Sequence, residues 1–373
     1  MQRPTWAEIN LNNLAMNYRA LRRFVGENVK VMAVVKADAY GHGALSCAKM
    51  LVQEGADWFG VALPEEAFEL RESGIEQPIL SLGGFWHGQE KFCLQNRITP
   101  IIYRLDMAES LDRAAREVNL IADVHVKIDT GMGRLGIRFE AIPEFAEALR
   151  QFKNLRVDGL MTHFAAADDL KSNDFTDQQT TKFTSAVDIF QAKGFRPTWR
   201  DLANSPATLA HKNTWGNLVR IGGALYGIGK DIFPKSETVE NLLPVMSIRS
   251  KITLLKNVPK GETLGYSRTF QTNRDSLIAT VPIGYNDGMP RALSNKGKAI
   301  VNGYFVPIVG RVSMDLTILD VTDLPHVEMF DEVIFAGSKG SKQITVEEMA
   351  AQSDTISYEI TCGIGKRVPR RFS

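Results

Sequence analysis

The chain has 373 residues, of which 44% are hydrophobic and 23% charged, a profile typical of a globular protein and not of a disordered or fibrous one. Its 44 lysines and arginines balance 43 acidic residues, and no basic run alternates with aromatic residues, which argues against a nucleic-acid-binding face. Apolar stretches stay far below the roughly 18 residues that cross a bilayer, so no membrane span is expected.

The N-terminus and the cysteines indicate where the protein works. Residues 1–10 carry charged and polar side chains where a secretory signal would have its apolar core, so a cytoplasmic protein is expected. Cys47, Cys93 and Cys362 are odd in number and lack CxxC spacing, which predicts neither a disulfide framework nor a metal site. We expect all three to be buried thiols.

The first 225 residues or so alternate short β-branched segments with helical patterns. A helix over residues 12–24, preceded by the packing residues Trp6 and Ile9, comes first, and Pro64 followed by two glutamates marks another helix start. Such alternation requires parallel strands, and eight of them predict a (β/α)8 barrel, with a doubly wound sheet as the second choice. The expected strands are 31–36, 58–62, 79–82, 98–102, 122–129, 157–163, 198–202 and 217–221.

After about residue 230 the pattern changes to strands without long helices between them. We therefore predict a barrel domain over residues 1–235 and a smaller, mostly-β C-terminal domain over 236–373. One helix is expected near 346–353. The expected strands of this domain are 245–255, 276–282, 298–301, 307–309, 316–321 and 332–336.

Active sites of barrels lie at the C-terminal ends of their strands, and these ends are polar here. Lys36 ends the first expected strand and precedes a glycine-containing turn. In the fifth strand His125, Lys127 and Asp129 alternate with aliphatic residues, so they are expected to face the barrel interior. A buried lysine in that position needs a charge partner or must lose its own charge.

The loops after the last two strands predict a phosphate site. Ser205 is expected to cap a helix that starts at Pro206, and helix N-termini attract anions. Gly222 and Gly223 leave backbone N–H groups free to approach a ligand closely. A site lysine with a distant phosphate cradle predicts pyridoxal 5'-phosphate (PLP), held covalently by Lys36.

Arg220, at the end of the eighth strand, has a specific predicted effect on this cofactor. A cation beside the pyridine nitrogen discourages protonation of that nitrogen, which limits how far the ring withdraws electrons from the substrate. Loss and return of the α-proton are then favoured over transamination. Racemisation requires one acid/base on each face of the α-carbon, and Lys36 would supply one of them.

Five segments together resemble the alanine racemase family over nearly the whole chain. They are AVVKADAYGHG (33–43), KIDTGMGR (127–134), PIGYNDG (282–288), GRVSMD (310–315) and CGIGKRVPR (362–370). The resemblance implies interconversion of L- and D-alanine, a precursor of peptidoglycan, by two bases. It also implies a head-to-tail homodimer in which each active site combines one barrel with the partner's β domain.

Residue roles follow from this resemblance alone. It makes Lys36 the lysine that holds the cofactor and one base, and Tyr266 the opposing base supplied by the partner. It places Tyr40, Asn204, Ser205, Gly222 and Tyr358 around the phosphate, with His163 and Arg220 at the ring. Substrate would meet Arg134 and the backbone at Met314, Lys127 would be carbamylated, and the entrance would be lined by Tyr285, Arg291 and Asp315.

Some positions depart from the family pattern, and other functions stay open. Gly223 replaces a bulkier aliphatic residue, Ser313 replaces a cysteine, and the loop 286–290 differs slightly. These departures bear on how tightly the substrate pocket excludes serine or larger amino acids, because one methylene contributes only about 1–3 kcal/mol of discrimination. A serine/alanine racemase, a PLP decarboxylase of the same architecture and a non-catalytic PLP carrier are the alternatives. Lys127 could also simply pair with Asp129.

Overall fold

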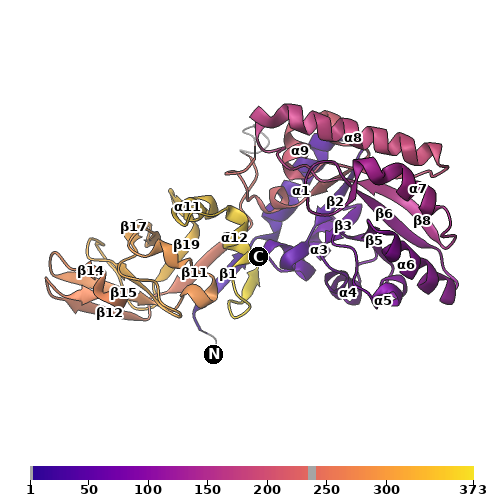
Figure 1. The fold of residues 1–373 in the computed structure, drawn as a ribbon. Coiled ribbons are helices and arrows are strands. Elements are labelled where there is room, and N and C mark those ends of the chain that lie inside the picture. Colours follow the sequence, from indigo (N-terminus) through magenta and orange to yellow (C-terminus); the bar gives the residue numbers. More distant parts are fainter. Residues whose placement is uncertain (1–2, 234–240) are drawn as a thin grey trace.

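The structure, a computed structural model, describes residues 3–233 and 241–373. The molecule has two lobes, a barrel surrounded by helices and a smaller lobe made largely of strands (Figure 1). The C-terminus lies where the two lobes meet. Among the described residues, no helix combines the length and apolarity that crossing a bilayer requires.

The larger lobe is a closed barrel, as predicted. Its eight parallel strands follow the order β5-β4-β3-β2-β10-β9-β8-β6, and pairing of β5 with β6 closes the ring within the described residues. In chain order they are β2 (Lys30–Val34), β3 (Trp58–Val61), β4 (Ile79–Ser81), β5 (Ile98–Ile102), β6 (Ala122–Asp129), β8 (Leu155–Met161), β9 (Trp199–Asp201) and β10 (Leu218–Ile221).

Two barrel strands end two residues earlier than predicted, and both ends matter for the site. The first strand stops at Val34, so Lys36 lies beyond it and begins a separate turn. The sixth stops at Met161, which leaves His163 in the following loop. Sequence patterns define an apolar strand well, but its end depends on where the neighbouring strands stop pairing.

Helices cover the outside of the barrel (Figure 1). Helix α1 begins after Asn10, whose side chain accepts a hydrogen bond from the Asn13 N–H at 2.9 Å, and buries Leu14, Tyr18 and Leu21 on one face. The helices are α1 (Leu11–Val25), α3 (Ala44–Gln53), α4 (Pro64–Glu72), α5 (Glu90–Gln95), α6 (Leu105–Glu117), α7 (Ile142–Leu149), α8 (Asn173–Ala192) and α9 (Ser205–Ala210). The 3-10 helices here are η1 (Phe139–Ala141), η2 (Leu170–Ser172), η3 (Lys212–Thr214) and η4 (Gly223–Tyr226), and a short strand, β7 (Ile137–Arg138), pairs with β6.

The smaller lobe contains a seven-stranded sheet with the order β17-β16-β19-β11-β1-β21, with β20 added to β19, a three-stranded sheet β12-β15-β18, and a hairpin β13–β14. Its helices are α11 (Val346–Gln352) and α12 (Ser357–Cys362), with 3-10 turns η5 (Tyr266–Arg268), η6 (Tyr285–Asp287) and η7 (Arg291–Leu293). Its strands are β11 (Met246–Lys251), β12 (Leu254–Val258), β13 (Thr263–Leu264), β14 (Phe270–Gln271), β15 (Ser276–Val281), β16 (Lys298–Val301), β17 (Tyr304–Pro307), β18 (Thr317–Asp320), β19 (Glu332–Lys339), β20 (Lys342–Ile344) and β21 (Arg370–Phe372).

Two strand predictions in this lobe were wrong. The segment 245–255 is not one strand, because the chain leaves one sheet after Lys251 and enters another at Leu254. The strand expected at 307–309 lies earlier, at Tyr304–Pro307, because the turn at Asn302 and Gly303 starts the return strand at once.

The N-terminal segment joins the two lobes. Strand β1 (Thr5–Ile9) pairs antiparallel with β11 and parallel with β21, so residues at both ends of the chain lie in the sheet of the smaller lobe. The predicted division between residues 235 and 236 lies outside the described residues and stays a prediction. One apolar core nevertheless runs from α1 through this sheet, and a second, separate cluster fills the barrel interior.

Candidate active site

Lys36 begins an unusual backbone turn, α2 (Lys36–Tyr40), at the end of the first barrel strand. Ala37, Asp38, Ala39 and Tyr40 have φ values of 53° to 55°, the left-handed helical region, although none is glycine. Each such residue costs roughly 1–2 kcal/mol. Strain of this kind persists only where surrounding contacts impose it, and it is concentrated at functional sites.

The surroundings of Lys36 favour the unprotonated form of its amino group. Burial lowers the pKa of Lys36 below its usual value, and the nearby cations Arg134 and Arg220 lower it further, while Glu66 opposes them. More of the lysine is therefore present as the free amine near neutral pH than for a solvated lysine. The free amine is the nucleophilic form that condenses with an aldehyde.

The predicted phosphate residues converge. The Gly222 N–H donates to Oγ of Ser205 at 2.9 Å, and a Cβ at Gly222 would lie 2.3 Å from the Tyr40 hydroxyl. A Cβ at Gly223 would lie 2.4 Å from the Tyr358 hydroxyl, and the rings of Tyr40 and Tyr358 are 5.6 Å apart. A side chain at either glycine would therefore displace one of these tyrosines, and the close approach of two hydroxyls to the backbone is suited to an anion such as phosphate.

The capping residue of α9 differs from the prediction. Asn204, not Ser205, is the N-cap, because its side chain accepts a hydrogen bond from the Ala207 N–H at 3.1 Å. Ser205 is the first residue of the helix, and its hydroxyl oxygen instead accepts a hydrogen bond from the Gly222 N–H. Ser205 therefore belongs to the cradle itself, whereas Asn204 sets the position of the helix.

Arg220 is buried at the end of β10 and held on several sides. Its Nη1 donates to the carboxylate of Asp201, and its Nη2 donates to the carbonyls of Thr162 (3.0 Å) and Leu202 (3.1 Å). Nη2 also lies 3.2 Å from Nδ1 of His163. Arginine only donates hydrogen bonds, so His163 must accept at Nδ1. Burial and Arg220 lower the pKa of His163 well below its usual value, which keeps the imidazole neutral.

Lys127 lies in the barrel interior, as predicted, in register with Met161 on β8 and Asp201 on β9. Burial lowers the pKa of Lys127 well below its usual value, and Arg220 adds to the effect, while Asp201 opposes it. The surroundings of Lys127 therefore favour its uncharged form over the ammonium. Asp129, the alternative partner, instead accepts hydrogen bonds from the N–H groups of Gly131 and Gly133, both at 3.0 Å.

These two hydrogen bonds shape the loop that carries Arg134. Arg134 is exposed on this loop, and its charge acts on both Lys36 and Lys127. The next loop is held by Gln179 of α8, whose side chain donates to Oγ1 of Thr130 (3.0 Å) and to the carbonyl of His163 (3.2 Å). The predicted barrel residues thus surround one mouth.

The predicted residues of the smaller lobe form a second group. Tyr266, 71% exposed, lies in the turn between β13 and β14, at the end of that lobe away from the barrel (Figure 1). The Tyr285 N–H donates to the carbonyl of Ser313, next to Met314, and Asp315 pairs with Arg367. Arg291 is exposed at the start of η7. One protomer therefore does not bring Tyr266 to its own Lys36.

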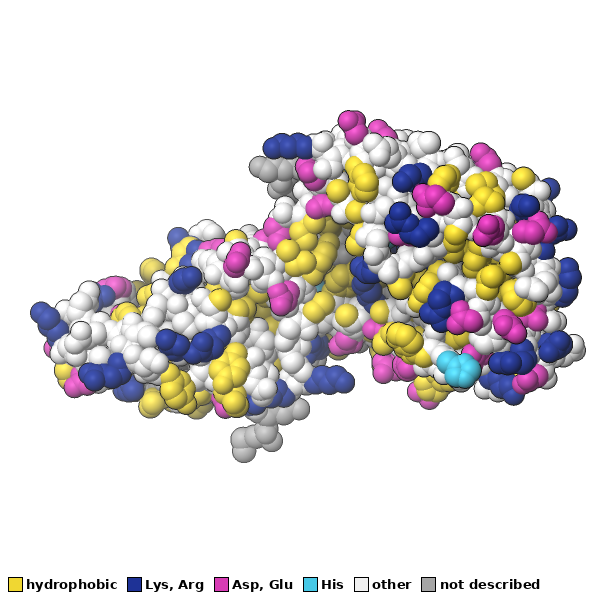
Figure 2. All heavy atoms as spheres, in the orientation of Figure 1, with side chains coloured by type: hydrophobic (Ala, Val, Ile, Leu, Met, Phe, Trp, Pro, Cys, Tyr) yellow, Lys and Arg dark blue, Asp and Glu magenta, His cyan; other side chains and the backbone are white. Residues whose placement is uncertain are grey.

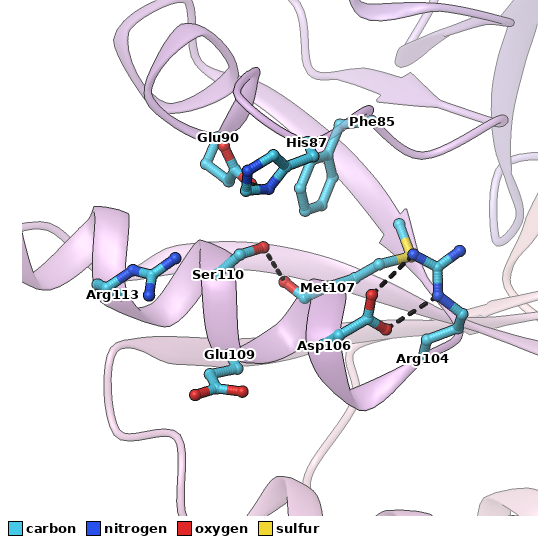
Figure 3. Close-up of a pocket in the computed structure, with 9 residues that line it drawn as sticks. All are labelled: Phe85, His87, Glu90, Arg104, Asp106, Met107, Glu109, Ser110 and Arg113. Carbon is cyan, nitrogen blue, oxygen red and sulfur yellow. Dashed lines mark hydrogen bonds and ion pairs between the residues drawn. The ribbon is translucent and has the colours of Figure 1, made fainter.

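The surface contains other features that do not belong to this site. A cavity of about 250 Å³ lies between α5 and α6, and two residues that line it, Arg104 and Asp106, pair with each other (Figure 3). His87, also in its lining, lies 3.6 Å from Glu90. Acidic and basic side chains are interspersed over the face seen in Figure 2. Cys47 and Cys93 are buried as expected, but Cys362 is exposed because it ends α12 beside the mouth.

Sequence reasoning missed several residues at the mouth. Asp201, the partner of Arg220, was assigned only to a strand, and its neighbour Arg200 in the short sequence WRD gives no sign that this aspartate is buried. Tyr226, whose hydroxyl donates to the Val34 carbonyl at 3.0 Å and whose ring lies 5.3 Å from that of Tyr40, carried no signal. For Glu66, the sequence predicted only a place in the first turn of a helix.

A barrel whose mouth holds a lysine of lowered pKa, a buried arginine and a cradle lined by glycines is typical of an enzyme. Comparison with known proteins identifies which one. Two family descriptions match, "Alanine racemase, N-terminal domain" over residues 9–230 and "Alanine racemase, C-terminal domain" over 245–372. The chain belongs to the alanine racemase family.

Individual relatives agree over the full length. An alanine racemase from Halothermothrix orenii is 42% identical over 372 residues, covering 99% of this chain and 97% of that protein. The crystal structure of alanine racemase from Streptomyces lavendulae has a TM-score of 0.92 at 34% identity, covering 100% of this chain and 98% of that one. The Bartonella henselae enzyme, described with covalently bound pyridoxal phosphate, has a TM-score of 0.89 at 31% identity and covers 99% of both chains.

Proposed function

We propose that this chain interconverts L- and D-alanine with pyridoxal 5'-phosphate held by Lys36. The observation that carries the proposal is the position of Arg220, buried, cationic and close enough to Lys36 to lower its pKa. The glycine-lined cradle of Tyr40, Ser205, Gly222 and Tyr358 supports a phosphorylated cofactor, because it gathers hydroxyl groups and backbone of the kind that bind a phosphate. When bound, the cofactor would acidify the α-proton of an attached amino acid.

The residues around the ring would restrict what happens next. Arg220 cannot accept a proton, so it would keep the pyridine nitrogen unprotonated and limit electron withdrawal. His163 is neutral and receives its hydrogen bond from the same guanidinium, so it adds no competing charge. Simple removal and return of the α-proton would therefore be favoured over transamination.

Two groups would handle that proton. Lys36, whose lowered pKa provides a free amine, would serve one face of the α-carbon. Tyr266 would serve the other face from the partner subunit of a homodimer, since it is exposed and remote from the barrel of its own chain. Each active site would then need both subunits.

The substrate would be bound and selected by the remaining residues. Arg134 and the backbone at Met314 would receive the carboxylate, and Tyr285, Arg291 and Asp315 would narrow the entrance. Lys127 is buried and its pKa is lowered, which favours the amine form that adds carbon dioxide, and the resulting carbamate would hold Arg134. The enzyme would work in the cytoplasm.

The test is hydrogen exchange at the α-carbon of alanine in heavy water, with optical rotation followed in parallel. The proposal expects deuterium to enter both enantiomers while rotation decays to zero from either side. Release of carbon dioxide would identify a decarboxylase, and absence of exchange a carrier. A parallel panel of serine and lysine tests whether the substrate range is broader than alanine.

A further inference from the structure

The left-handed turn after Lys36 is anchored from outside by one side chain. Glu66, in the first turn of α4, is the third residue after the N-cap Leu63. Its Oε1 accepts a hydrogen bond from the Ala37 N–H at 2.7 Å, and Ala37 is the first residue after Lys36 and the first of the left-handed turn. The contact joins two segments 29 residues apart in the chain.

The second oxygen of Glu66 fixes the carboxylate itself. Oε2 accepts hydrogen bonds from the N–H groups of Ala62 (2.6 Å) and Leu63 (3.2 Å), which immediately follow β3. A glutamate that reaches back in this way caps the start of its own helix. Because both oxygens accept from backbone donors, the carboxylate is held in one orientation between the ends of two neighbouring barrel strands.

Other contacts secure the far end of the turn and leave its beginning to Glu66. Asp38 accepts from the Ala44 N–H at 2.7 Å, and Arg370 donates to the Gly41 carbonyl at 3.0 Å. Asp38 links the middle of the turn to the start of α3, and Arg370 holds the residue after Tyr40, so both contacts act beyond Ala37. Directly after Lys36, the backbone is anchored by the hydrogen bond from the Ala37 N–H to the Glu66 side chain.

We propose that Glu66 is a positioning residue for Lys36, holding the left-handed turn so that the amino group points into the barrel mouth. The inference rests on the proposed function, because it gives Lys36 the role of the cofactor lysine and of one base. Glu66 itself contacts backbone and would act only through Lys36.

Removal of Glu66 is expected to loosen the turn without unfolding the barrel. Glu66 is half-buried and lines a cavity of about 440 Å³ on the outer side of the turn, which also includes Asp38 and Glu69. Water in this cavity can reach the freed N–H groups. The cost then appears as disorder of the turn, because the left-handed conformation loses an anchor that opposed its strain.

Glu66→Gln and Glu66→Ala test the proposal, with Glu69→Gln as the matched control one turn further along the same helix. Glutamine keeps the volume but offers one acceptor oxygen in place of two. Amide hydrogen exchange, followed by mass spectrometry on the holoenzyme, is expected to be at least 10-fold faster over residues 37–44 in both Glu66 variants. The control should exchange like the parent protein.

A second measurement separates positioning from general loss of structure. Exchange of the α-hydrogen with retention of configuration reports each face of the α-carbon by itself. We expect exchange on the face served by Lys36 to fall about 10- to 100-fold in Glu66→Gln, while exchange on the opposite face stays within about 3-fold. A purely structural role would reduce both faces together.

Unchanged amide exchange over residues 37–44, or an equal fall on both faces, would overturn the proposal. If Glu66→Ala does not fold, the amide exchange and the α-hydrogen exchange are both measured on Glu66→Gln alone. Failure of the proposed function is distinguishable, because the parent protein would then show no α-hydrogen exchange on either face. In that case the amide exchange still reports whether Glu66 holds the turn.

Discussion

Asp201 and Arg220 form an ion pair inside the barrel, and neither side chain exposes more than 3% of its surface. Within the described part of the chain, the second carboxylate oxygen of Asp201 has no hydrogen-bond partner, and Lys127 acts on the pKa of this carboxylate together with Arg220. Two potential cations thus share one buried anion. Because Arg220 always remains protonated, only Lys127 can change its charge, and that charge depends on how far Arg220 already balances the Asp201 carboxylate.

Asp201→Asn is expected to destabilise the protein by about 3–5 kcal/mol, because it leaves the buried guanidinium without a counter-ion. Urea unfolding at pH 7 measures this loss. Asp123→Asn is the control, since Asp123 pairs with Arg156 at the surface and should contribute about 1 kcal/mol or less. Equal, small losses in the two variants would contradict a structural role for the buried pair.

His125→Leu is expected to make the protein less sensitive to acid. Burial, with a smaller contribution from Arg220, lowers the pKa of His125 to about 3, and neither ring nitrogen has a partner among the described residues. The folded state therefore binds fewer protons than the unfolded state between about pH 3 and 6.5, so its stability falls as pH falls through that window.

The leucine variant should match the parent protein or exceed it slightly at pH 7, because an unpaired polar group is replaced by an apolar one of similar volume. At pH 4 it should be more stable than the parent by roughly 3 kcal/mol. Unfolding free energies at pH 7, 5 and 4 measure both differences. Parallel pH dependences in the two proteins would show that His125 is already protonated in the folded state.

Lys36→Ala should abolish the absorption band of the lysine-bound cofactor, because the amine that holds it is gone. Borohydride reduction followed by peptide mapping should tag Lys36 in the parent protein and nothing in the variant. A tag on another amine would refute the assignment of Lys36.

Tyr266→Phe should lower racemisation by about 10²- to 10⁴-fold, the usual contribution of a general acid or base. Exchange of the α-hydrogen with retention should persist on the face served by Lys36. Tyr304→Phe, an exposed tyrosine at a different site of the same lobe, is the control. Loss of exchange on both faces would argue against two separate bases.

Gly223→Ala should weaken binding of pyridoxal 5'-phosphate. A Cβ at this position would lie 2.4 Å from the Tyr358 hydroxyl, so the ring must move out of the cradle. Overpacking of this kind costs about 1–3 kcal/mol, which is roughly 5- to 150-fold in affinity. Fluorescence titration of the cofactor measures the change, and an unchanged Kd would show that Tyr358 does not shape the cradle.

Much of the architecture was predictable because it depends on local patterns. Strands β5 and β6 lie where the alternation of side chains placed them, and Lys127 faces the barrel interior as its position in β6 requires. One of the family motifs, KIDTGMGR (127–134), begins on β6 itself. Period and composition are properties of short segments, so they can be read without knowing what each segment packs against.

Tertiary contacts decided what those patterns could not. Strand β1 joins a sheet whose neighbouring strands are more than 200 residues away, and Asp201 becomes the partner of Arg220 only when β9 and β10 meet. The left-handed turn after Lys36 opposes the intrinsic preference of its own residues and depends on Glu66 from another helix. The sequence by itself determined the barrel, the β domain and the identity of the reactive side chains. Their orientation, charge state and partners came from long-range packing, because each depends on groups that only the folded chain brings together.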